Sequence, residues 1–208
     1  LRYKSRKDKN PPIIAICDVS GSMSRYSRML LHFMHVLTTL RNDVHTFLFG
    51  TRLTNVTRFL RFKDVDEALA ATSSAVEDWS GGTRIGDCLK DFNFNWSRRV
   101  LGPGAIVLFI TDGLDRGGGI GLSKQIKLIQ KSSKRLIWLN PLLRYEEFAP
   151  KPTGVKAILP FVDEFRPIHS LESMDQLVNA LSETNLQSRF NMAPWLQKLS
   201  EIENAECH

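Results

Sequence analysis

The stretch PPIIAICDVSGSM, residues 11–23, decides the fold. It opens with a short apolar run bounded by prolines and by a turn, and such a run predicts a buried β-strand over residues 11–18. Asp18, Ser20 and Ser22 follow at alternate positions where that strand ends. Since alternate residues of an extended chain point the same way, we expect these three side chains to face a common site.

Strands and helices alternate downstream of this stretch. Residues 24–40 carry apolar side chains at helical spacing, and residues 105–111 (AIVLFIT) form an unbroken apolar run, typical of a central parallel strand covered on both faces. The remaining pattern predicts strands at 44–49 and 136–139, a short one at 56–62 and a last one within 155–165, and helices at 65–76, from Ile85, at 122–133 and at 174–181. This alternation predicts an α/β fold with a doubly wound, mostly parallel central sheet and helices on both faces, as in Rossmann-like proteins.

We expect one domain over residues 11–183, with a basic linker at 1–10 and a C-terminal extension at 184–208. Of the 208 residues, 42% are hydrophobic, which suits one domain with a sizeable core. The net charge is +6, and residues 1–10 supply +4 of it, from five Lys/Arg and one Asp. A solvated linker explains this charge better than a nucleic-acid surface does. Because the chain begins with leucine, we expect it to be part of a longer or processed protein.

The cysteines predict the compartment. Cys17 falls within the first predicted strand, Cys88 on the inward face of the helix from Ile85, and Cys207 close to the end of the chain. Their odd number and their spacing fit no zinc pattern, so we expect buried, reduced thiols and a cytoplasmic protein. No signal peptide is expected at residues 1–10, and no apolar run is long enough to cross a bilayer.

Three polar segments are expected to meet at one edge of the sheet. They are residues 18–22 (DVSGS), residues 81–83 (GGT) and residues 111–113 (TDG). Ligands of open α/β sheets collect at the carboxyl ends of the strands, near the switch in strand order. The side chains that carry chemistry there are the carboxylates of Asp18 and Asp112 and the hydroxyls of Ser20, Ser22 and Thr83.

These five side chains form an all-oxygen set of hard ligands. Such a set suits Mg²⁺, with Mn²⁺ or Ca²⁺ as alternatives, and is poor for zinc. Five groups can reach an octahedral ion, some of them through water, and leave one position open. Gly21 lets the backbone turn at the site, and Gly81 and Gly82 let Thr83 approach closely. The helix predicted after Ser22 adds free N–H groups that help to hold an anion.

Some of these residues also have a purely structural interpretation. Asp18 or Asp112 taken alone would fit a helix cap, but the complete set of five favours a metal site. Gly81 and Gly82 could form only a flexible turn.

Neighbouring residues leave two interpretations open. Asp115 could support the metal ligands or be a solvated loop charge. Trp79 could anchor a partner or pack beneath its loop. Arg52 and Arg84 could attract an acidic partner or be ordinary surface charges.

The pattern D-x-S-x-S, followed by a distant Thr and a distant Asp, resembles the metal-ion-dependent adhesion site (MIDAS) of von Willebrand factor type A domains. Asp18, Ser20, Ser22, Thr83 and Asp112 occupy its five positions. Longer stretches narrow the resemblance over roughly residues 10–170. DVSGSM (18–23), FLFGTRLTNVTR (47–58), DWSGGTRIGDCL (78–89), TDGLDRG (111–117) and RLIWLNPLL (135–143) look like the CoxE-like subfamily.

The resemblance implies a non-enzymatic, metal-dependent protein-interaction module. In such sites the hydroxyls of Ser20, Ser22 and Thr83 bind the metal. Asp18 and Asp112 bind it directly or through water, and a partner's Asp or Glu carboxylate can fill the open position. CoxE-like proteins resemble accessory proteins of MoxR-type AAA+ ATPases, and some are implicated in maturing molybdenum-containing carbon monoxide dehydrogenase. The implied role is therefore an adaptor for an AAA+ ATPase that acts on a client metalloenzyme.

An Mg²⁺-dependent phosphohydrolase is the alternative function. An Asp after the first strand resembles aspartyl-phosphate enzymes, but these need a second acid two residues on and a lysine nearby. That position holds Ser20 here, and no lysine lies near the three polar segments. Nucleotide binding is disfavoured because G-x-x-x-x-G-K-[ST] and a post-strand G-x-G-x-x-G are both absent, and the glycines at 117–121 lack the lysine.

Overall fold

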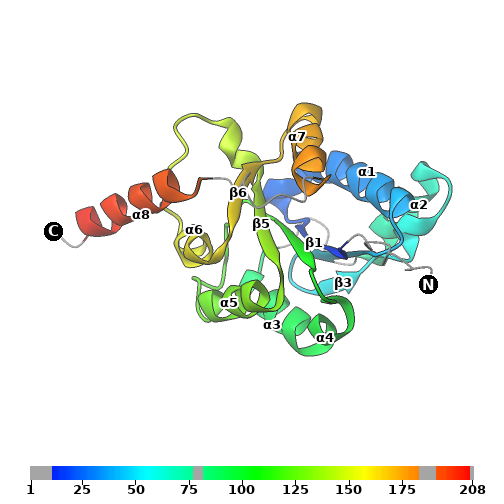
Figure 1. The fold of residues 1–208 in the computed structure, drawn as a ribbon, viewed down its shortest axis with the longest axis horizontal. Coiled ribbons are helices and arrows are strands. Elements are labelled where there is room, and N and C mark those ends of the chain that lie inside the picture. The colour runs from blue at the N-terminus through cyan, green and yellow to red at the C-terminus, as the bar shows by residue number, and fades with distance from the viewer. Residues whose placement is uncertain (1–10, 77–81, 183–190, 207–208) are drawn as a thin grey trace, which may run out of the picture.

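Six strands form one sheet at the centre of the molecule (Figure 1). The computed structural model describes residues 11–76, 82–182 and 191–206. The strands are β1 Ile13–Asp18, β2 Val44–Phe49, β3 Leu53–Asn55, β4 Ile106–Ile110, β5 Arg135–Asn140 and β6 Glu164–Pro167, in the order β3-β2-β1-β4-β5-β6. All neighbouring strands pair in parallel except β2 and β3, which are antiparallel. The prediction of a mostly parallel, doubly wound α/β sheet is therefore confirmed.

The central strands β1 and β4 are buried on both faces. Every residue of either strand is buried. Because side chains alternate along a strand, Ile13, Ala15 and Cys17 enter the core on one face of the sheet, and Ile14 and Ile16 enter the core on the other. This two-sided burial explains why both segments are almost continuously apolar.

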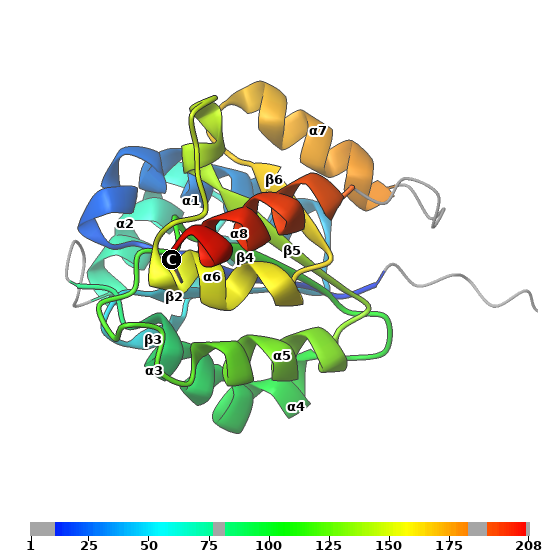
Figure 2. The ribbon, with the colours of Figure 1, turned by 90° about the vertical axis from the view of Figure 1, so that its left-hand side faces the viewer.

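The helices divide between the two faces of the sheet (Figure 2). One layer contains α1 Ser24–Leu40, α2 Val65–Ala75 and α7 Leu171–Ser182. The other contains α3 Ile85–Asp91, α4 Ser97–Val100, α5 Leu122–Ser132, α6 Thr153–Ile158 and α8 Ala193–Glu206, with a π-helical turn at Phe92–Trp96 between α3 and α4. The helix predicted at residues 24–40 coincides with α1 at both ends.

The third strand was wrongly predicted at residues 56–62. The structure has β3 at Leu53–Asn55, because the chain turns back immediately after β2 and pairs Leu53 with Phe49. The residues that follow leave the sheet and form a 3₁₀ turn, Phe59–Arg61. Val56 and Leu60 are buried there, so their apolar character comes from core packing and not from a strand.

The last strand begins only at the end of the predicted range of residues 155–165 and continues beyond it. α6 and a 3₁₀ turn, Leu159–Phe161, occupy most of that range, and β6 starts at Glu164. Val155, Ile158 and Leu159 are buried on one face of the sheet. Their spacing of three and four residues is helical, which explains why the run forms a helix.

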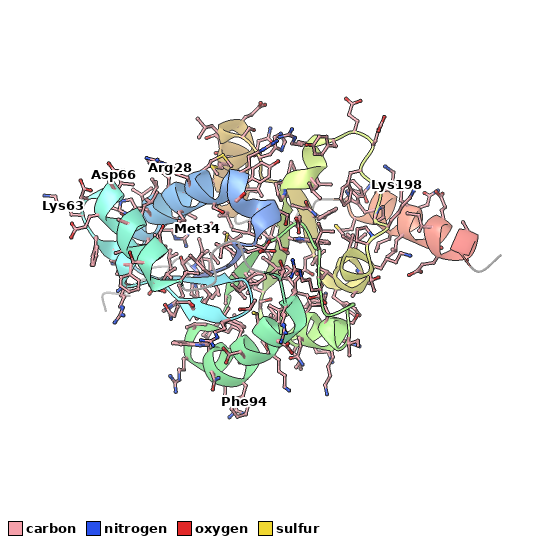
Figure 3. All side chains as sticks on the ribbon, turned by 180° about the vertical axis from the view of Figure 1, so that it is seen from behind. Arg28, Met34, Lys63, Asp66, Phe94 and Lys198 are labelled. Carbon is pink, nitrogen blue, oxygen red and sulfur yellow. The ribbon has the colours of Figure 1, made fainter. Side chains whose placement is uncertain are left out.

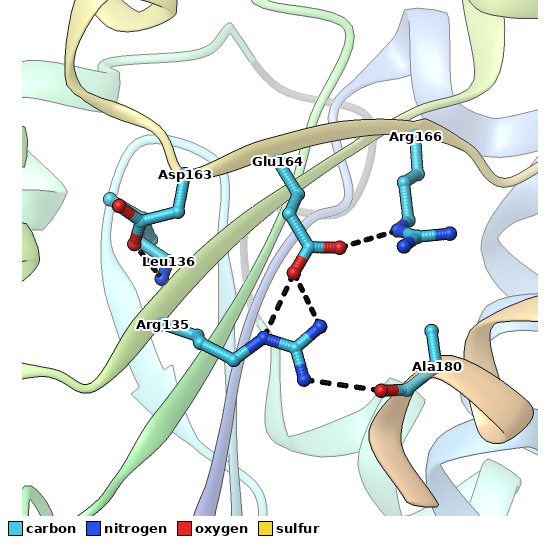
Figure 4. A network of polar contacts seen from close by, with 6 residues as sticks. All are labelled: Arg135, Leu136, Asp163, Glu164, Arg166 and Ala180. Atoms are coloured by element: carbon cyan, nitrogen blue, oxygen red, sulfur yellow. Dashed lines mark hydrogen bonds and ion pairs between the residues drawn. The ribbon is translucent and has the colours of Figure 1, made fainter. Parts of the chain in front are cut away.

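An ion-pair network attaches β6 to the sheet (Figure 4). The buried Glu164 carboxylate accepts hydrogen bonds from Nε and Nη2 of Arg135 on β5, and from Nε of Arg166 at 2.6 Å. Arg135 also donates to the backbone carbonyl of Ala180 in α7 at 3.1 Å. Since Arg135 is the first residue of β5, the network lies at the end of that strand away from the carboxyl edge.

In the layer of α1, α2 and α7, Arg28 of α1 and Asp66 of α2 form an ion pair (Figure 3). Their atoms Nη2 and Oδ1 are 3.8 Å apart, and the side chains are 85% and 82% exposed. Exposed pairs of this kind contribute little to stability. Apolar side chains such as Leu31 and Leu69 therefore hold the two helices on the sheet.

The C-terminal helix α8 lies within the predicted extension at residues 184–208, and it starts against the domain and projects from it (Figure 1). The ring centroid of Trp195 lies 5.1 Å from that of Phe165 and 5.9 Å from that of Phe148. Leu199 is buried in the same cluster. α8 therefore packs on the core near β6 through Trp195 and Leu199, while most of its other residues are exposed. The predicted linker at residues 1–10 lies outside the described residues, as does Cys207. None of the described helices combines the length and apolar character needed to span a membrane.

Candidate metal centre

The carboxyl ends of β1 and β4 lie side by side and bring Asp18 next to Thr111. The register pairs Cys17 with Ile110, so Asp18 and Thr111, which follow them, lie at the same level. Thr111 donates a hydrogen bond from Oγ1 to Oδ2 of Asp18 at 2.8 Å. The two central strands are thus joined by side chains at the edge where the ligands were predicted.

Asp18 is fully buried, and the protein holds both of its carboxylate oxygens. Oδ1 accepts a hydrogen bond from the backbone N–H of Ser20 at 2.8 Å, and Oδ2 accepts the one from Thr111. Burial is the main cause that raises the pKa of Asp18 to about 6. The Asp112 carboxylate adds to the rise, and the hydrogen bonds from Ser20 and Thr111 oppose it. A cation beside Asp18 would favour its ionised form.

The hydroxyls of Ser20 and Ser22 lie next to each other, with their oxygens 3.3 Å apart. Ser20 is extended, with φ −60° and ψ 168°, and the 3₁₀ turn Gly21–Met23 then leads into α1. Neighbouring oxygens around an octahedral Mg²⁺ are about 3 Å apart, because each lies about 2.1 Å from the ion. The spacing of these two hydroxyls therefore fits two ligands of one ion.

Asp112 is the second buried carboxylate at this edge. Its Oδ1 accepts a hydrogen bond from the backbone N–H of Leu114 at 3.0 Å, and its backbone carbonyl accepts one from the side chain of Asn140 at 3.2 Å. Gly113 follows with φ +82°, and a Cβ there would lie 2.9 and 3.0 Å from side chains of α6 and β5. The turn that directs the chain away from Asp112 therefore requires glycine.

Thr83 is buried between the turn after β2 and the loop after β4. Its backbone carbonyl accepts a hydrogen bond from the N–H of Arg116 at 3.0 Å. The next residue, Arg84, donates its N–H to the carbonyl of Gly50, also at 3.0 Å. These two bonds explain how a residue distant in sequence reaches the edge. Gly81 and Trp79, which the sequence also singled out, lie outside the described residues.

Asp115 holds the loop after β4 in place. Its Oδ1 accepts a hydrogen bond from the backbone N–H of Ile85 at 2.9 Å, and its Oδ2 accepts one from Gly119 at 3.0 Å. The side chain is half-buried. Of the two interpretations of Asp115, these hydrogen bonds favour a residue that positions the loop at the site.

An open cleft of about 370 Å³ lies at the edge, lined by Ser20, Ser22 and Thr83 among others. Asp18 and Asp112 adjoin it, since Asp18 is bonded to Ser20, and Asp112 is bonded to Leu114, which also lines the cleft. The structure thus gathers all five predicted residues at the carboxyl edge, and the three that carry hydroxyls line a space that a ligand can enter.

The donor set fits a hard divalent cation. In the described part of the chain, no three His, Cys, Asp or Glu side chains gather, so hydroxyls must complete the set. Within the same residues, no Lys, Arg or His forms an ion pair with Asp18 or Asp112. Two buried carboxylates without a counter-charge are unfavourable, and a bound cation would neutralise them.

The sequence alone did not reveal the roles of two residues that position the site, Asn140 and Arg116. Asn140 ends β5 and bonds to Asp112 across the sheet, so its place at the end of a strand is the signal that could have revealed it. The contact of Arg116 with the loop around Thr83 depends on how two loops fold together, and no sequence signal indicates it.

The order of the strands and the carboxylates and hydroxyls at the carboxyl ends of β1 and β4 agree with a von Willebrand factor type A (VWA) domain, the class that the matching family model names. The chain belongs to the family described as VWA domain containing CoxE-like protein, whose sequence model matches residues 1–174. Both predictions, of the fold and of the family, are confirmed. No curated protein sequence matches the chain at a significant level.

Solved structures share this fold at low sequence identity. Proximal thread matrix protein 1 from the mussel byssus is 18% identical with a TM-score of 0.54, over 84% of this chain and 47% of that one. The same mussel protein with a zinc-occupied MIDAS motif is 17% identical with a TM-score of 0.52, over 84% and 47%. The pilus adhesin SpaC from Lactobacillus rhamnosus GG is 12% identical with a TM-score of 0.56, over 84% and 30%. The chain therefore spans less than half the length of these proteins.

Proposed function

We propose that this domain is a metal-dependent protein-interaction module and not an enzyme. The observation that carries the proposal is the pair of buried carboxylates, Asp18 and Asp112, which lie beside three hydroxyls and have no cationic partner among the described residues. When bound, a divalent cation would supply an electrophilic position for an anion from a partner.

Each of the five residues has a role in this proposal. Ser20, Ser22 and Thr83 would hold the cation through their hydroxyls, which line the cleft. Asp18 and Asp112 would hold it directly or through water and balance its charge. We expect Mg²⁺, with Mn²⁺ or Ca²⁺ as alternatives, because all the donors are oxygen atoms. The zinc-occupied MIDAS of the mussel protein supports a divalent cation in a site of this type.

The cleft is open, which favours binding of a partner. A partner's Asp or Glu carboxylate could enter it and take the remaining coordination position. Membership of the CoxE-like family supports a MoxR-type AAA+ ATPase and a client metalloenzyme as the partners. The thiols of Cys17 and Cys88 are buried, and burial raises the pKa of the Cys17 thiol, which agrees with a reducing compartment such as the cytoplasm.

The geometry disfavours the phosphohydrolase alternative. Asp18 has no exposed surface, and both of its oxygens accept hydrogen bonds, so it is poorly placed to attack a phosphorus atom. Ser20 occupies the position where such enzymes need a second acid. No lysine is among the residues that line the cleft.

Calorimetric titration with Mg²⁺, Mn²⁺ and Zn²⁺ tests the proposal. We expect the wild type to bind one divalent ion, and Asp18→Ala and Ser20→Ala to lose that binding while both variants stay folded. Asp66→Asn is the matched control, because it removes an exposed carboxylate from α2 and should leave metal binding unchanged. Equal metal binding by wild type and Asp18→Ala would contradict the proposed site.

The partner is tested separately by capture of a MoxR-type AAA+ ATPase on immobilised wild-type domain, in Mg²⁺ and in EDTA. Capture that needs Mg²⁺ and is lost with Asp18→Ala is the expected result. Capture that is equal in EDTA would show that the interaction does not depend on the metal.

A further inference from the structure

A second pocket adjoins the metal cleft. Its volume is about 360 Å³, and its lining residues are Thr51, Gly82, Arg84, Asp87, Arg116 and Gly117. Gly82 and Arg116 also line the metal cleft. A ligand bound in the cleft can therefore continue into the second pocket.

Arg116 is the residue that connects the two spaces. Its side chain lies across Gly82 so closely that a Cβ on Gly82 would be 2.7 Å from Nη1 and 2.8 Å from Cδ of Arg116. Its backbone N–H donates to the carbonyl of Thr83, one of the proposed metal ligands, at 3.0 Å. The guanidinium thus lies beside the metal cleft because its own backbone is bonded to the loop that forms the cleft.

The charges of the second pocket favour a single carboxylate. Arg84 and Arg116 are exposed, and neither forms an ion pair with a carboxylate of the described residues. Asp87 is the acidic residue in the lining, so two arginines and one aspartate give a charge of +1. A singly charged carboxylate neutralises that charge. The planar guanidinium also suits it, because it can donate two parallel hydrogen bonds to a carboxylate.

We propose that the pocket formed by Arg84 and Arg116 binds a second carboxylate of the same partner segment that binds at the metal. The inference rests on the proposed function and specifies the partner: an acidic peptide segment with two Asp or Glu residues close together in sequence. One carboxylate would bind at the cation, and the other would bind between the two arginines. A segment with a single acid would bind more weakly.

Fluorescence polarisation with short Gly/Ser peptides tests the inference in saturating Mg²⁺. One peptide carries a single Asp, and the others add a second Asp at increasing separation from the first. For the wild type, we expect the best two-acid peptide to bind about tenfold more tightly than the one-acid peptide. Arg84→Gln and Arg116→Gln should each remove most of this gain, and Asp87→Asn should increase it.

Arg98→Gln is the matched control, because it removes an exposed arginine of α4, outside both pockets, and should preserve the gain. Gly82→Ala should reduce the gain without removing a charge, because the added Cβ displaces the Arg116 guanidinium. Calorimetry should show that Mg²⁺ binding is not weakened in the arginine variants, because glutamine keeps the backbone N–H groups through which residues 84 and 116 position the loop of Thr83, and the loss of a nearby positive charge favours a cation.

The outcomes separate this inference from the proposed function. Mg²⁺-dependent binding of both peptides with equal affinity would overturn the second carboxylate site and leave the metal-dependent module intact. A gain that survives in Arg84→Gln and Arg116→Gln would also overturn it. Failure of every peptide to bind in an Mg²⁺-dependent way would contradict the proposed function itself, and the inference with it.

Discussion

Thr111 and Asp18 are joined by a hydrogen bond of 2.8 Å from Oγ1 to Oδ2, although they are 93 positions apart in the chain. The same hydroxyl oxygen accepts a hydrogen bond from the N–H of Gly113 at 3.1 Å. One side chain therefore fixes both the carboxylate at the end of β1 and the turn after β4. The protein itself positions Asp18 before any cation binds, which is how a site is preorganised.

Thr111→Val should weaken the metal site without removing a proposed ligand. Valine keeps the shape but loses both hydrogen bonds, so we expect Mg²⁺ affinity to fall roughly tenfold and the free energy of unfolding to fall by about 1–2 kcal/mol. Calorimetry and urea unfolding measure the two effects. Thr111→Ser keeps the hydroxyl and should restore most of the affinity; a serine variant as weak as the valine variant would refute the role of this bond.

The raised pKa of Asp18 predicts a pH dependence of stability. The pKa of Asp18 is about 6 in the folded protein against an ordinary value of 3.8, so the fold favours the protonated form. Protonated Asp18 therefore makes its full contribution to the free energy of unfolding below pH 3.8, and this contribution is lost as the pH rises through about 6. A rise of this size corresponds to about 3 kcal/mol.

Asp18→Asn removes that titration. In EDTA, the unfolding free energy of Asp18→Asn minus that of the wild type should grow by about 3 kcal/mol between about pH 4 and about pH 7. Urea unfolding across this pH range measures the difference, and a difference that stays constant with pH would show that Asp18 does not titrate as expected. Mg²⁺ should stabilise the wild type at neutral pH and leave Asp18→Asn unchanged.

Gly113→Ala and Gly118→Ala form a matched pair. Both glycines have positive φ, at +82° and +63°. A Cβ at Gly113 would collide with Val155 and Trp138, whereas nothing lies within 4 Å of one at Gly118. We expect Gly113→Ala to cost about 3 kcal/mol or more and Gly118→Ala about 1 kcal/mol, the cost of the backbone conformation alone. Thermal unfolding ranks the two, and similar melting temperatures would be the contrary result.

Trp195→Ala should destabilise the domain without affecting metal binding. The tryptophan packs on Phe165 of β6 and on Phe148, and none of these residues lines the metal cleft. We therefore expect a loss of about 2–3 kcal/mol in unfolding free energy and unchanged Mg²⁺ affinity. Gln197→Ala, on the exposed side of α8, is the control. Identical unfolding curves for both variants would mean that α8 does not contribute to the core in solution.

Much of the fold could be predicted from the sequence because burial leaves a periodic pattern. The predicted ranges of α1 and β2 coincide with the structure at both ends. The predicted range of β3 was wrong, and β6 begins only at the end of its predicted range. These edge strands have three and four residues, so they carry little periodic pattern. The acid of β6, Glu164, is buried only because Arg135 and Arg166 pair with it, a tertiary contact without local signal.

Only part of the candidate site could be predicted from the sequence. The residues Asp18, Ser20 and Ser22 lie close together in sequence, so their spacing revealed them. Their metal-binding role stays a prediction, although the structure places them together. The positions of Asn140 and Arg116 depend on strand order and on contacts between loops, which no single segment of sequence encodes.

The two strands that end in the site are the two best placed to bear mechanical load. β1 is hydrogen-bonded to β2 and β4, and β4 is hydrogen-bonded to β1 and β5, all in parallel. A pull on Asp18 and Asp112 away from the edge runs along these strands, so it strains many inter-strand hydrogen bonds in shear at once and does not peel them apart one by one. A pulling force from the proposed partner would therefore pass into the sheet through its two central strands.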